Sequence, residues 1–167
     1  MSFCVECGAE LAEQWVAVEG RSRLVCRGCG HIHYLNPKVV AATLPVLDGK
    51  VVLIRRALEP RLGSWSYPAG FVEIGETVEE AAVRETSEEA CLAVSIDRLL
   101  NVYTSPDAAV VVIAYLARCE GAEPRPGAKA LEVGLFSPEE LPWEDLAFPT
   151  TVAALRDWVR LARPKAR

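Results

Sequence analysis

Runs of apolar residues in the middle of the chain predict the strands of a β-sheet. Two of these runs flank Asp48-Gly49, a dipeptide typical of a two-residue hairpin turn. Residues 109–117, AVVVIAYLA, are apolar throughout, which predicts a strand buried on both faces. The predicted strands are residues 39–47, 51–55, 93–103, 109–117 and 131–136. The stretch between the hairpin and the next motif, residues 58–66, contains proline and glycine and predicts a loop.

Helical signals appear in three later segments. Thr77 is followed by Glu80, the T-x-x-E pattern of a capping box, and predicts the start of a helix. Ser137, with proline next to it, predicts the cap of a short helix. Residues 150–162 carry apolar side chains at helical spacing and predict a final amphipathic helix that ends before Pro164.

The helix that follows Thr77 predicts a chemical site. A helix turns about 100° per residue, so Glu85, Glu88 and Glu89 fall within one sector of roughly 100°. Neighbouring carboxylates repel one another unless a cation lies between them. Oxygen ligands of this kind suit Mg²⁺ or Mn²⁺. A solvated acidic helix without a metal is the alternative interpretation.

Four cysteines near the N-terminus predict a second metal site. Cys4-x-x-Cys7 and Cys26-x-x-Cys29 have the spacing of a four-cysteine zinc site. Two short predicted strands, residues 14–18 and 22–25, lie between the pairs and give the layout of a zinc ribbon. Four thiolates close the coordination shell, so the zinc would be structural. A redox C-x-x-C motif and a pair of disulfides are the competing interpretations.

Composition limits the classes of partner. The net charge of −5 argues against a sequence-independent nucleic-acid binder. No apolar run reaches the roughly 18 residues that a membrane helix needs. The first residues do not have the pattern of a secretory signal, and the cysteine spacing favours metal over disulfides, so we expect a reducing cytoplasm.

Residues 70–92 resemble the signature of the Nudix hydrolases. The matching positions are Gly70, Glu76, Arg84, Glu85, Glu88, Glu89 and Leu92. Thr86 stands where the family has an aliphatic residue, and Cys91 stands where it has glycine. A residue with a Cβ is disfavoured in the left-handed geometry that glycine adopts after a helix. Either Cys91 takes that geometry, or the helix ends differently and moves Glu89.

The resemblance implies an α/β fold with two parts. Residues 1–35 would form the zinc ribbon, and residues 36–167 a Nudix domain, an α/β/α sandwich with a mixed sheet. It also implies hydrolysis of the pyrophosphate bond in a nucleoside diphosphate derivative, with release of a nucleoside monophosphate. The carbonyl of Ala69 would join Glu85, Glu88 and Glu89 at Mg²⁺ or Mn²⁺. Members are often homodimers.

The segments around the signature are similar to a subgroup of zinc-ribbon Nudix proteins, the FAD or ADP-ribose pyrophosphatases. The larger NADH pyrophosphatases carry a different motif where this chain has residues 103–107, which makes NADH a weaker candidate. The subgroup has glutamate where Lys129 stands and Ser-Gln where Ala109-Val110 stands. We expect these positions on the substrate side.

The resemblance assigns further roles to individual residues. Arg84 would pair with Glu76 and orient the glutamates, while Glu89 or Glu132 would act as the base. Trp65, Tyr67 and Phe71 are candidates for stacking on a substrate ring, with core packing as the alternative, and Lys129 is a candidate substrate contact. A nucleotide-sensing or nucleic-acid- or protein-binding module with a degenerate Nudix domain is the alternative to an enzyme.

Overall fold

The structure, a computed structural model, describes residues 2–121 and 123–162 and divides into two compact units. The first unit ends at Asn36 and the second begins at Pro37. Within the described residues, no helix is long and apolar enough to cross a membrane.

The first unit is a small antiparallel sheet in the order β1-β2-β3. Its strands are β1 (Leu11–Val16), β2 (Arg21–Cys26) and β3 (Ile32–His33). The predicted pair of strands is present, but both strands begin earlier than expected, because the turn occupies residues 17–20. Gly20, with φ of 63°, adopts the left-handed geometry that closes this turn. The buried cluster of the unit contains Cys4, Leu11 and Cys26, so two of its three members are cysteines.

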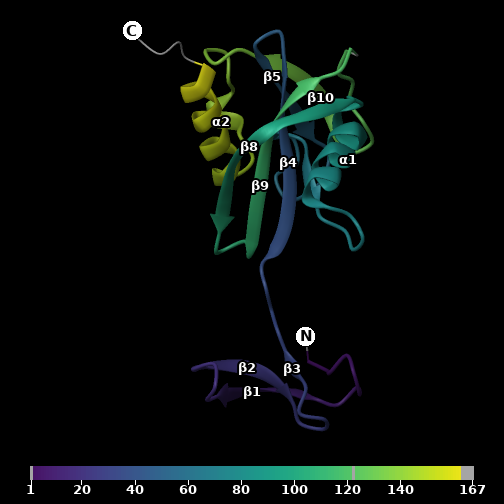
Figure 1. Cartoon of the computed structure of the whole chain (residues 1–167), viewed down its shortest axis with the longest axis vertical. Coiled ribbons are helices and arrows are strands. Elements are labelled where there is room, and N and C mark those ends of the chain that lie inside the picture. The colour runs from purple at the N-terminus through teal and green to yellow at the C-terminus, as the bar shows by residue number, and fades with distance from the viewer. Residues whose placement is uncertain (1, 122, 163–167) are drawn as a thin grey trace. The chain divides into compact units, whose positions relative to one another are not determined.

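The second unit is built on a mixed sheet (Figure 1). Its strands are β4 (Lys38–Leu47), β5 (Lys50–Arg56), β6 (Trp65–Ser66), β7 (Ala69–Phe71), β8 (Val94–Ser105), β9 (Val110–Cys119) and β10 (Ala130–Phe136). The order is β10-β5-β4-β9-β8, with β6 paired to β5 and β7 paired to β4. Strands β4 and β9 run parallel, whereas the other pairs are antiparallel.

Two α-helices cover the sheet, α1 (Val78–Ala90) and α2 (Pro149–Ala162), and a short 3₁₀ helix, η1 (Trp143–Asp145), precedes α2. Side chains on β4 alternate between the two faces. Ala42 and Leu44 join the buried cluster that contains Trp158 of α2, whereas Ala41 joins the cluster that contains Ala82 of α1. The helices therefore lie on opposite faces of the sheet, as Figure 1 shows, and the predicted α/β/α sandwich is confirmed.

The hairpin prediction is confirmed, because Asp48 and Gly49 both have positive φ, 49° and 77°, and Leu47 pairs with Lys50. The predicted short helix at Ser137 is wrong. The chain there makes a single turn in which the N–H of Glu140 donates to the carbonyl of Ser137, and Pro142 follows two residues later. The residue before a proline is biased away from helical geometry, which prevents a further turn.

The predicted loop at residues 58–66 and the segment that follows it contain two strands that the sequence did not indicate. Strand β6 pairs Trp65 with Arg55, and β7 pairs Gly70 with Ala41. Their two and three residues are too short for a recognisable alternation pattern. Strand β7 matters most, because it brings the backbone of Ala69 and Gly70 against α1.

Candidate active site

Helix α1 begins where its sequence predicts, and its end follows the first of the two alternatives for Cys91. The side chain of Thr77 accepts from the N–H of Glu80, and the carboxylate of Glu80 accepts from the N–H of Thr77, so the capping box is formed. The helix ends at Ala90, and Cys91 takes the left-handed conformation, with φ of 51° and ψ of 35°. Its N–H donates to the carbonyl of Ser87. Glu89 therefore remains in the last helical turn.

Thr86 shows how a polar residue fits the buried side of α1. Its side chain is fully buried, and its hydroxyl donates to the carbonyl of Ala82 at 2.7 Å. The hydroxyl oxygen of Thr43 on β4 lies 2.6 Å from the hydroxyl oxygen of Thr86. Because Thr86 has one proton and gives it to Ala82, Thr43 is the donor in this second bond. Both hydroxyls are satisfied, which explains why threonine is tolerated where an aliphatic residue is usual.

Glu85 lies against the backbone of β7. Only 4% of its surface is exposed, and a Cβ on Gly70 would come within 2.1 Å of its carboxylate. No side chain at position 70 is compatible with this placement of Glu85. A side chain at position 70 would force the carboxylate of Glu85 to move away from the strand.

Arg84 holds the beginning and the end of the signature together. Its guanidinium donates two hydrogen bonds to Glu76, at 3.0 and 2.7 Å, and one to the carbonyl of Phe71 at 3.2 Å. The same side chain contacts Glu85 at 2.6 Å and Glu88 at 3.4 Å. The bond from Arg84 lowers the pKa of Glu76 to about 2, so this carboxylate stays ionised. Arg84 is thus fixed by Glu76 while it contacts two of the predicted metal ligands.

Lys129 lies among the glutamates. Its ammonium is 3.1 Å from Oε2 of Glu85 and 2.9 Å from Oε2 of Glu88. The hydrogen bond from Lys129 lowers the pKa of Glu88. The residue that the sequence places on the substrate side is therefore, in this structure, an ion-pair partner of two helix carboxylates.

Glu89 points elsewhere, toward the start of β7. It is 5% exposed, and its Oε2 accepts from the N–H of Ala69 at 3.1 Å. Burial raises its pKa to about 7, and the nearby carboxylate of Glu85 contributes to the rise. At neutral pH Glu89 can therefore both accept and release a proton.

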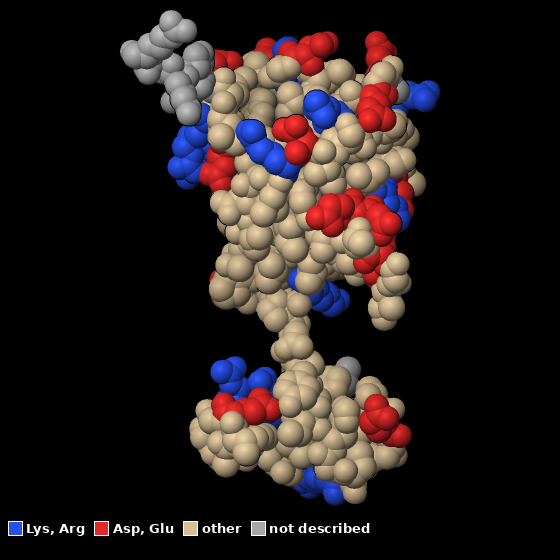
Figure 2. Space-filling model, viewed as in Figure 1, with Lys and Arg blue, Asp and Glu red and all other residues tan. Residues whose placement is uncertain are grey.

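The three glutamates share a helix face, as predicted, but their oxygens do not converge. Among the described residues, the four N-terminal thiols are the only set of three or more His, Cys, Asp or Glu ligand atoms that all lie within 4.8 Å of one another. The chemistry of the carboxylates nevertheless fits a hard divalent cation, because Glu85 and Glu88 already direct one oxygen each at a shared positive charge. Figure 2 shows acidic side chains, with basic ones among them, over the α1 side of this unit.

A cavity of about 400 Å³ lies on the α2 side of the sheet, across β7 from the helix carboxylates. Ala69 and Gly70 line it, and these are the two residues that contact Glu89 and Glu85. Tyr67 and Phe71 also line it, as does Phe148, whose ring lies 5.1 Å beneath the guanidinium of Arg56. Sequence reasoning assigned no role to Arg56 or Phe148, although both lie in the segments that resemble the zinc-ribbon subgroup. A larger, open depression of about 730 Å³ beside α2 contains none of the predicted site residues.

Trp65 and Glu132 lie away from this cavity. The ring of Trp65 packs edge-on against Phe136 at 5.0 Å, which is the core-packing alternative. Glu132 forms an ion pair with Arg55 at 3.5 Å. Val133 packs on the α1 face of β10 and Phe136 on the α2 face, so alternation puts Glu132 on the face opposite α1. The structure does not bring Glu132 to the helix carboxylates.

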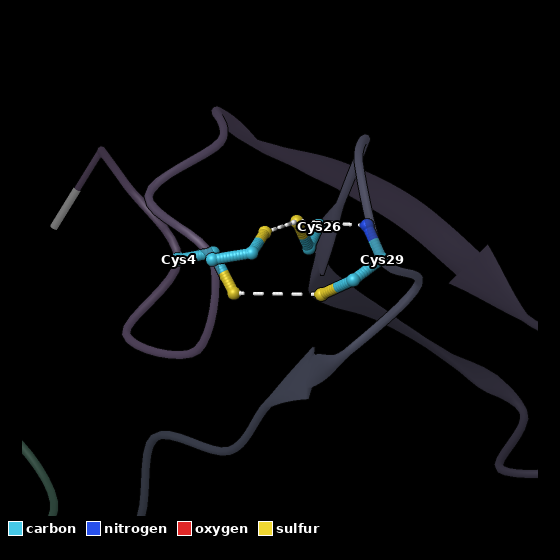
Figure 3. Close-up of side chains that lie close together, drawn as sticks. Cys4, Cys26 and Cys29 are labelled. Atoms are coloured by element: carbon cyan, nitrogen blue, oxygen red, sulfur yellow. Dashed lines mark hydrogen bonds between the residues drawn. The ribbon is translucent and has the colours of Figure 1, made fainter.

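The four N-terminal cysteines gather at the end of β2 (Figure 3). Sulfur atoms of Cys4 and Cys29 are 3.8 Å apart, and those of Cys7 and Cys26 are 3.4 Å apart, and all four residues are free thiols. The N–H groups of Cys29 and Gly28 donate to the sulfur of Cys26 and lower its pKa to about 6. A thiolate held by backbone donors is the form that binds zinc, so the set fits a closed structural site.

Comparison with known proteins identifies the family. The NUDIX domain model matches residues 37–160, which is most of the chain. The chain belongs to the Nudix hydrolase family. A second model, the Nudix N-terminal zinc ribbon, matches residues 2–35. Nudix enzymes use a divalent metal, and this chain is accordingly an enzyme that acts on pyrophosphate bonds in nucleoside diphosphate derivatives. The alternative of a purely regulatory module is not supported.

Several similar proteins have names or solved structures. An ADP-ribose pyrophosphatase of Methanocaldococcus jannaschii is 41% identical over 113 residues, 65% of this chain and 67% of that protein. The NAD-capped RNA hydrolase NudC of Chromobacterium violaceum is 32% identical over 90% of this chain, which spans only 55% of that protein's length. The crystal structure of a NUDIX hydrolase from Nitrosomonas europaea superposes with a TM-score of 0.89 and 39% identity, over 96% of this chain and 91% of that one.

Proposed function

We propose that this Nudix enzyme hydrolyses ADP-ribose, or FAD by the same reaction, with Mg²⁺ or Mn²⁺ as the catalytic cation. The observation that carries the proposal is that Ala69 and Gly70 belong both to the carboxylate site and to the cavity. A pyrophosphate bound near Glu85 and Glu89 would place its adenosine in this cavity. The similarity to an ADP-ribose pyrophosphatase supports the choice of substrate.

Glu85, Glu88 and Glu89, with the carbonyl of Ala69, would hold the cation. Once bound, the cation would neutralise the pyrophosphate and make water a better nucleophile. Water attacks one phosphorus, the bridging oxygen leaves with the other phosphate, and ADP-ribose gives AMP and ribose 5-phosphate. Glu89 would take the proton of the attacking water, because it lies on α1 with the other proposed ligands, whereas Glu132 lies on the face opposite α1 and does not line the cavity.

Other side chains of the site would bind and orient. Arg84, anchored by Glu76, would hold Glu85 and Glu88 in place. Tyr67, Phe71 and Phe148 line the cavity and would surround the adenine, with Arg56 stacked on Phe148 beside the phosphates. The zinc ribbon, held by Cys4, Cys7, Cys26 and Cys29, would be structural.

A dinucleotide such as NADH is a second candidate substrate. The match to the NAD-capped RNA hydrolase includes the zinc ribbon and covers 90% of this chain, more than the match to the ADP-ribose pyrophosphatase does.

We also propose a cytoplasmic homodimer. Its support is the edge strand β8, where Leu99 and Val102 are about half exposed, and the six free cysteines, which suit a reducing compartment.

The test is a substrate panel of ADP-ribose, FAD, NADH and a nucleoside triphosphate with Mg²⁺, with the nucleoside monophosphate as the measured product. We expect AMP from ADP-ribose at the highest kcat/KM. Glu88→Gln and Glu89→Gln should each lower that rate about a hundredfold or more, because each removes a charge from the reacting site. The matched control is Glu139→Gln, an exposed carboxylate outside the site, which should retain the wild-type rate. Wild-type turnover in both site variants would refute the assignment.

A further inference from the structure

The position of Lys129 carries an inference beyond the proposed reaction, although it rests on Glu85 and Glu88 as metal ligands. Each of these carboxylates uses both of its oxygens for a cationic side chain. The Oε1 atoms face Arg84, at 2.6 and 3.4 Å, and the Oε2 atoms face Lys129, at 3.1 and 2.9 Å. Two negative and two positive side chains thus form a closed array at the place that a divalent cation would take.

The two cations of this array are held differently. Arg84 is fixed from outside by two bonds to Glu76 and one to the carbonyl of Phe71. The ammonium of Lys129 has only Glu85 and Glu88 as partners among the interactions of the described residues, and 40% of its side chain is exposed. A lysine is also a compact charge on a flexible stem, whereas a guanidinium is a planar fork. Lys129 is therefore the cation that can leave.

The backbone that carries Lys129 is docked on α1. The N–H of Arg125 donates to the carbonyl of Ala90, and the N–H of Gly127 donates to the carbonyl of Glu89, at 2.9 and 3.0 Å. A Cβ on Gly127 would lie 1.7 Å from the carbonyl oxygen of Glu88, so this approach requires glycine. The carbonyl of Lys129 itself accepts from the N–H of Ala57. The loop is thus positioned by backbone contacts that do not depend on the ammonium.

We propose that Lys129 is an internal cation that occupies the metal ligands Glu85 and Glu88 in the metal-free enzyme and is displaced when a divalent cation binds. A divalent ion has to replace two existing ion pairs before it gains the Oε2 atoms, which raises the metal concentration needed to load the site. Lys129 is then a positioning residue that sets metal affinity, and its backbone stays docked while its ammonium moves.

The test measures Mn²⁺ binding without substrate, by electron paramagnetic resonance of the free ion and by calorimetry. Lys129→Met keeps the length of the stem and removes the charge, and it should bind Mn²⁺ on the order of tenfold more tightly, since two modest ion pairs no longer compete. Lys129→Arg keeps the charge and should stay within about threefold of the wild type. The matched control is Lys50→Met, which breaks an exposed lysine–glutamate pair with Glu140 and should leave Mn²⁺ affinity unchanged.

Three results would overturn the proposal. They are an unchanged Mn²⁺ affinity in Lys129→Met, a gain that Lys50→Met reproduces, and a crystal structure of the wild type with bound Mn²⁺ in which Lys129 still contacts both carboxylates. The structure with Mn²⁺ needs no variant, so the proposal stays testable even if Lys129→Met fails to fold. Mn²⁺ binding that persists in Glu85→Gln and Glu88→Gln would instead refute the ligand assignment and the proposed function with it.

Discussion

Cys91 adopts the left-handed backbone conformation of the family's glycine, although its Cβ makes that conformation sterically unfavourable. The family places glycine here, and the structure gives Cys91 the same left-handed conformation, with φ of 51°. The conformation is imposed from both sides, since Leu92 and Ala90 are fully buried. The side chain of Cys91 is exposed, so it gains no packing in return. The helix keeps its length, and Glu89 keeps its place.

We predict that Cys91→Gly stabilises the protein by about 1 kcal/mol, because glycine adopts this conformation without the steric penalty of a Cβ. Cys91→Ala is the matched control, since it removes the thiol but keeps the Cβ, and it should leave the stability within about 0.3 kcal/mol of the wild type. Urea unfolding of the three proteins measures the difference. Equal stability of the glycine and alanine variants would show that the conformation is not strained.

Helix α1 is attached to its surroundings on two sides by polar side chains that bond to groups outside the helix. Arg84 contacts Glu76 and the carbonyl of Phe71, both of which precede the helix, and so ties the loop after β7 to the helix surface. On the other side, Thr86 and Thr43 join the helix to β4. Glu85 lies between these two contacts, and Arg84 also contacts its carboxylate directly.

The Glu76–Arg84 pair predicts an acid dependence of stability. The pKa of Glu76 is lowered to about 2 in the folded protein, whereas an unfolded glutamate titrates near pH 4.5. The unfolded chain therefore takes up the proton first, so the contribution of the pair is present above about pH 5 and is lost as the pH falls toward 2. Between pH 5 and 3, the melting temperature of the wild type should fall further than that of Glu76→Gln. Glu139→Gln, which lies outside the pair, should follow the wild type, and parallel curves for wild type and Glu76→Gln would contradict the prediction.

At the scale of the whole molecule, two units with different sources of stability share one chain. The second unit has extensive buried clusters on both faces of its sheet. The buried cluster of the first unit is limited to Cys4, Leu11 and Cys26, with Ala9 and Leu24 partly buried beside it. A unit of this size needs a metal or a disulfide to fold, and its cysteines are free.

We predict that a strong zinc chelator unfolds the first unit and leaves the second folded. Hydrogen exchange followed by mass spectrometry should show loss of protection in β1 and β2, while β4 and β9 remain protected. Cys26→Ser should give the same pattern without chelator, because it removes the thiol that the backbone N–H groups hold as a thiolate. Protection of β1 and β2 that survives chelation would show that the ribbon folds without zinc.

The sequence by itself determined the features that depend on short-range spacing. The capping box at Thr77, the Asp48-Gly49 hairpin and the shared helix face of Glu85, Glu88 and Glu89 follow from residues a few positions apart, because local geometry fixes which groups can meet. The two C-x-x-C pairs belong to the same class, and their thiols do meet. The long signature was specific enough to identify the family and its reaction.

Only the tertiary structure decided which distant groups meet these residues. Lys129 lies 41 residues from Glu88, and no local pattern relates them; the loop docked on the end of α1 brings them together. Glu89 turns to Ala69, and Glu132 falls on the opposite face, because sheet pairing and strand alternation assign each side chain to a face. The cavity lined by Phe71 and Phe148 likewise exists only between β7 and the start of α2. The partners of the three helix glutamates therefore depend on charge and packing between elements that lie far apart in the sequence, which a local sequence pattern does not encode.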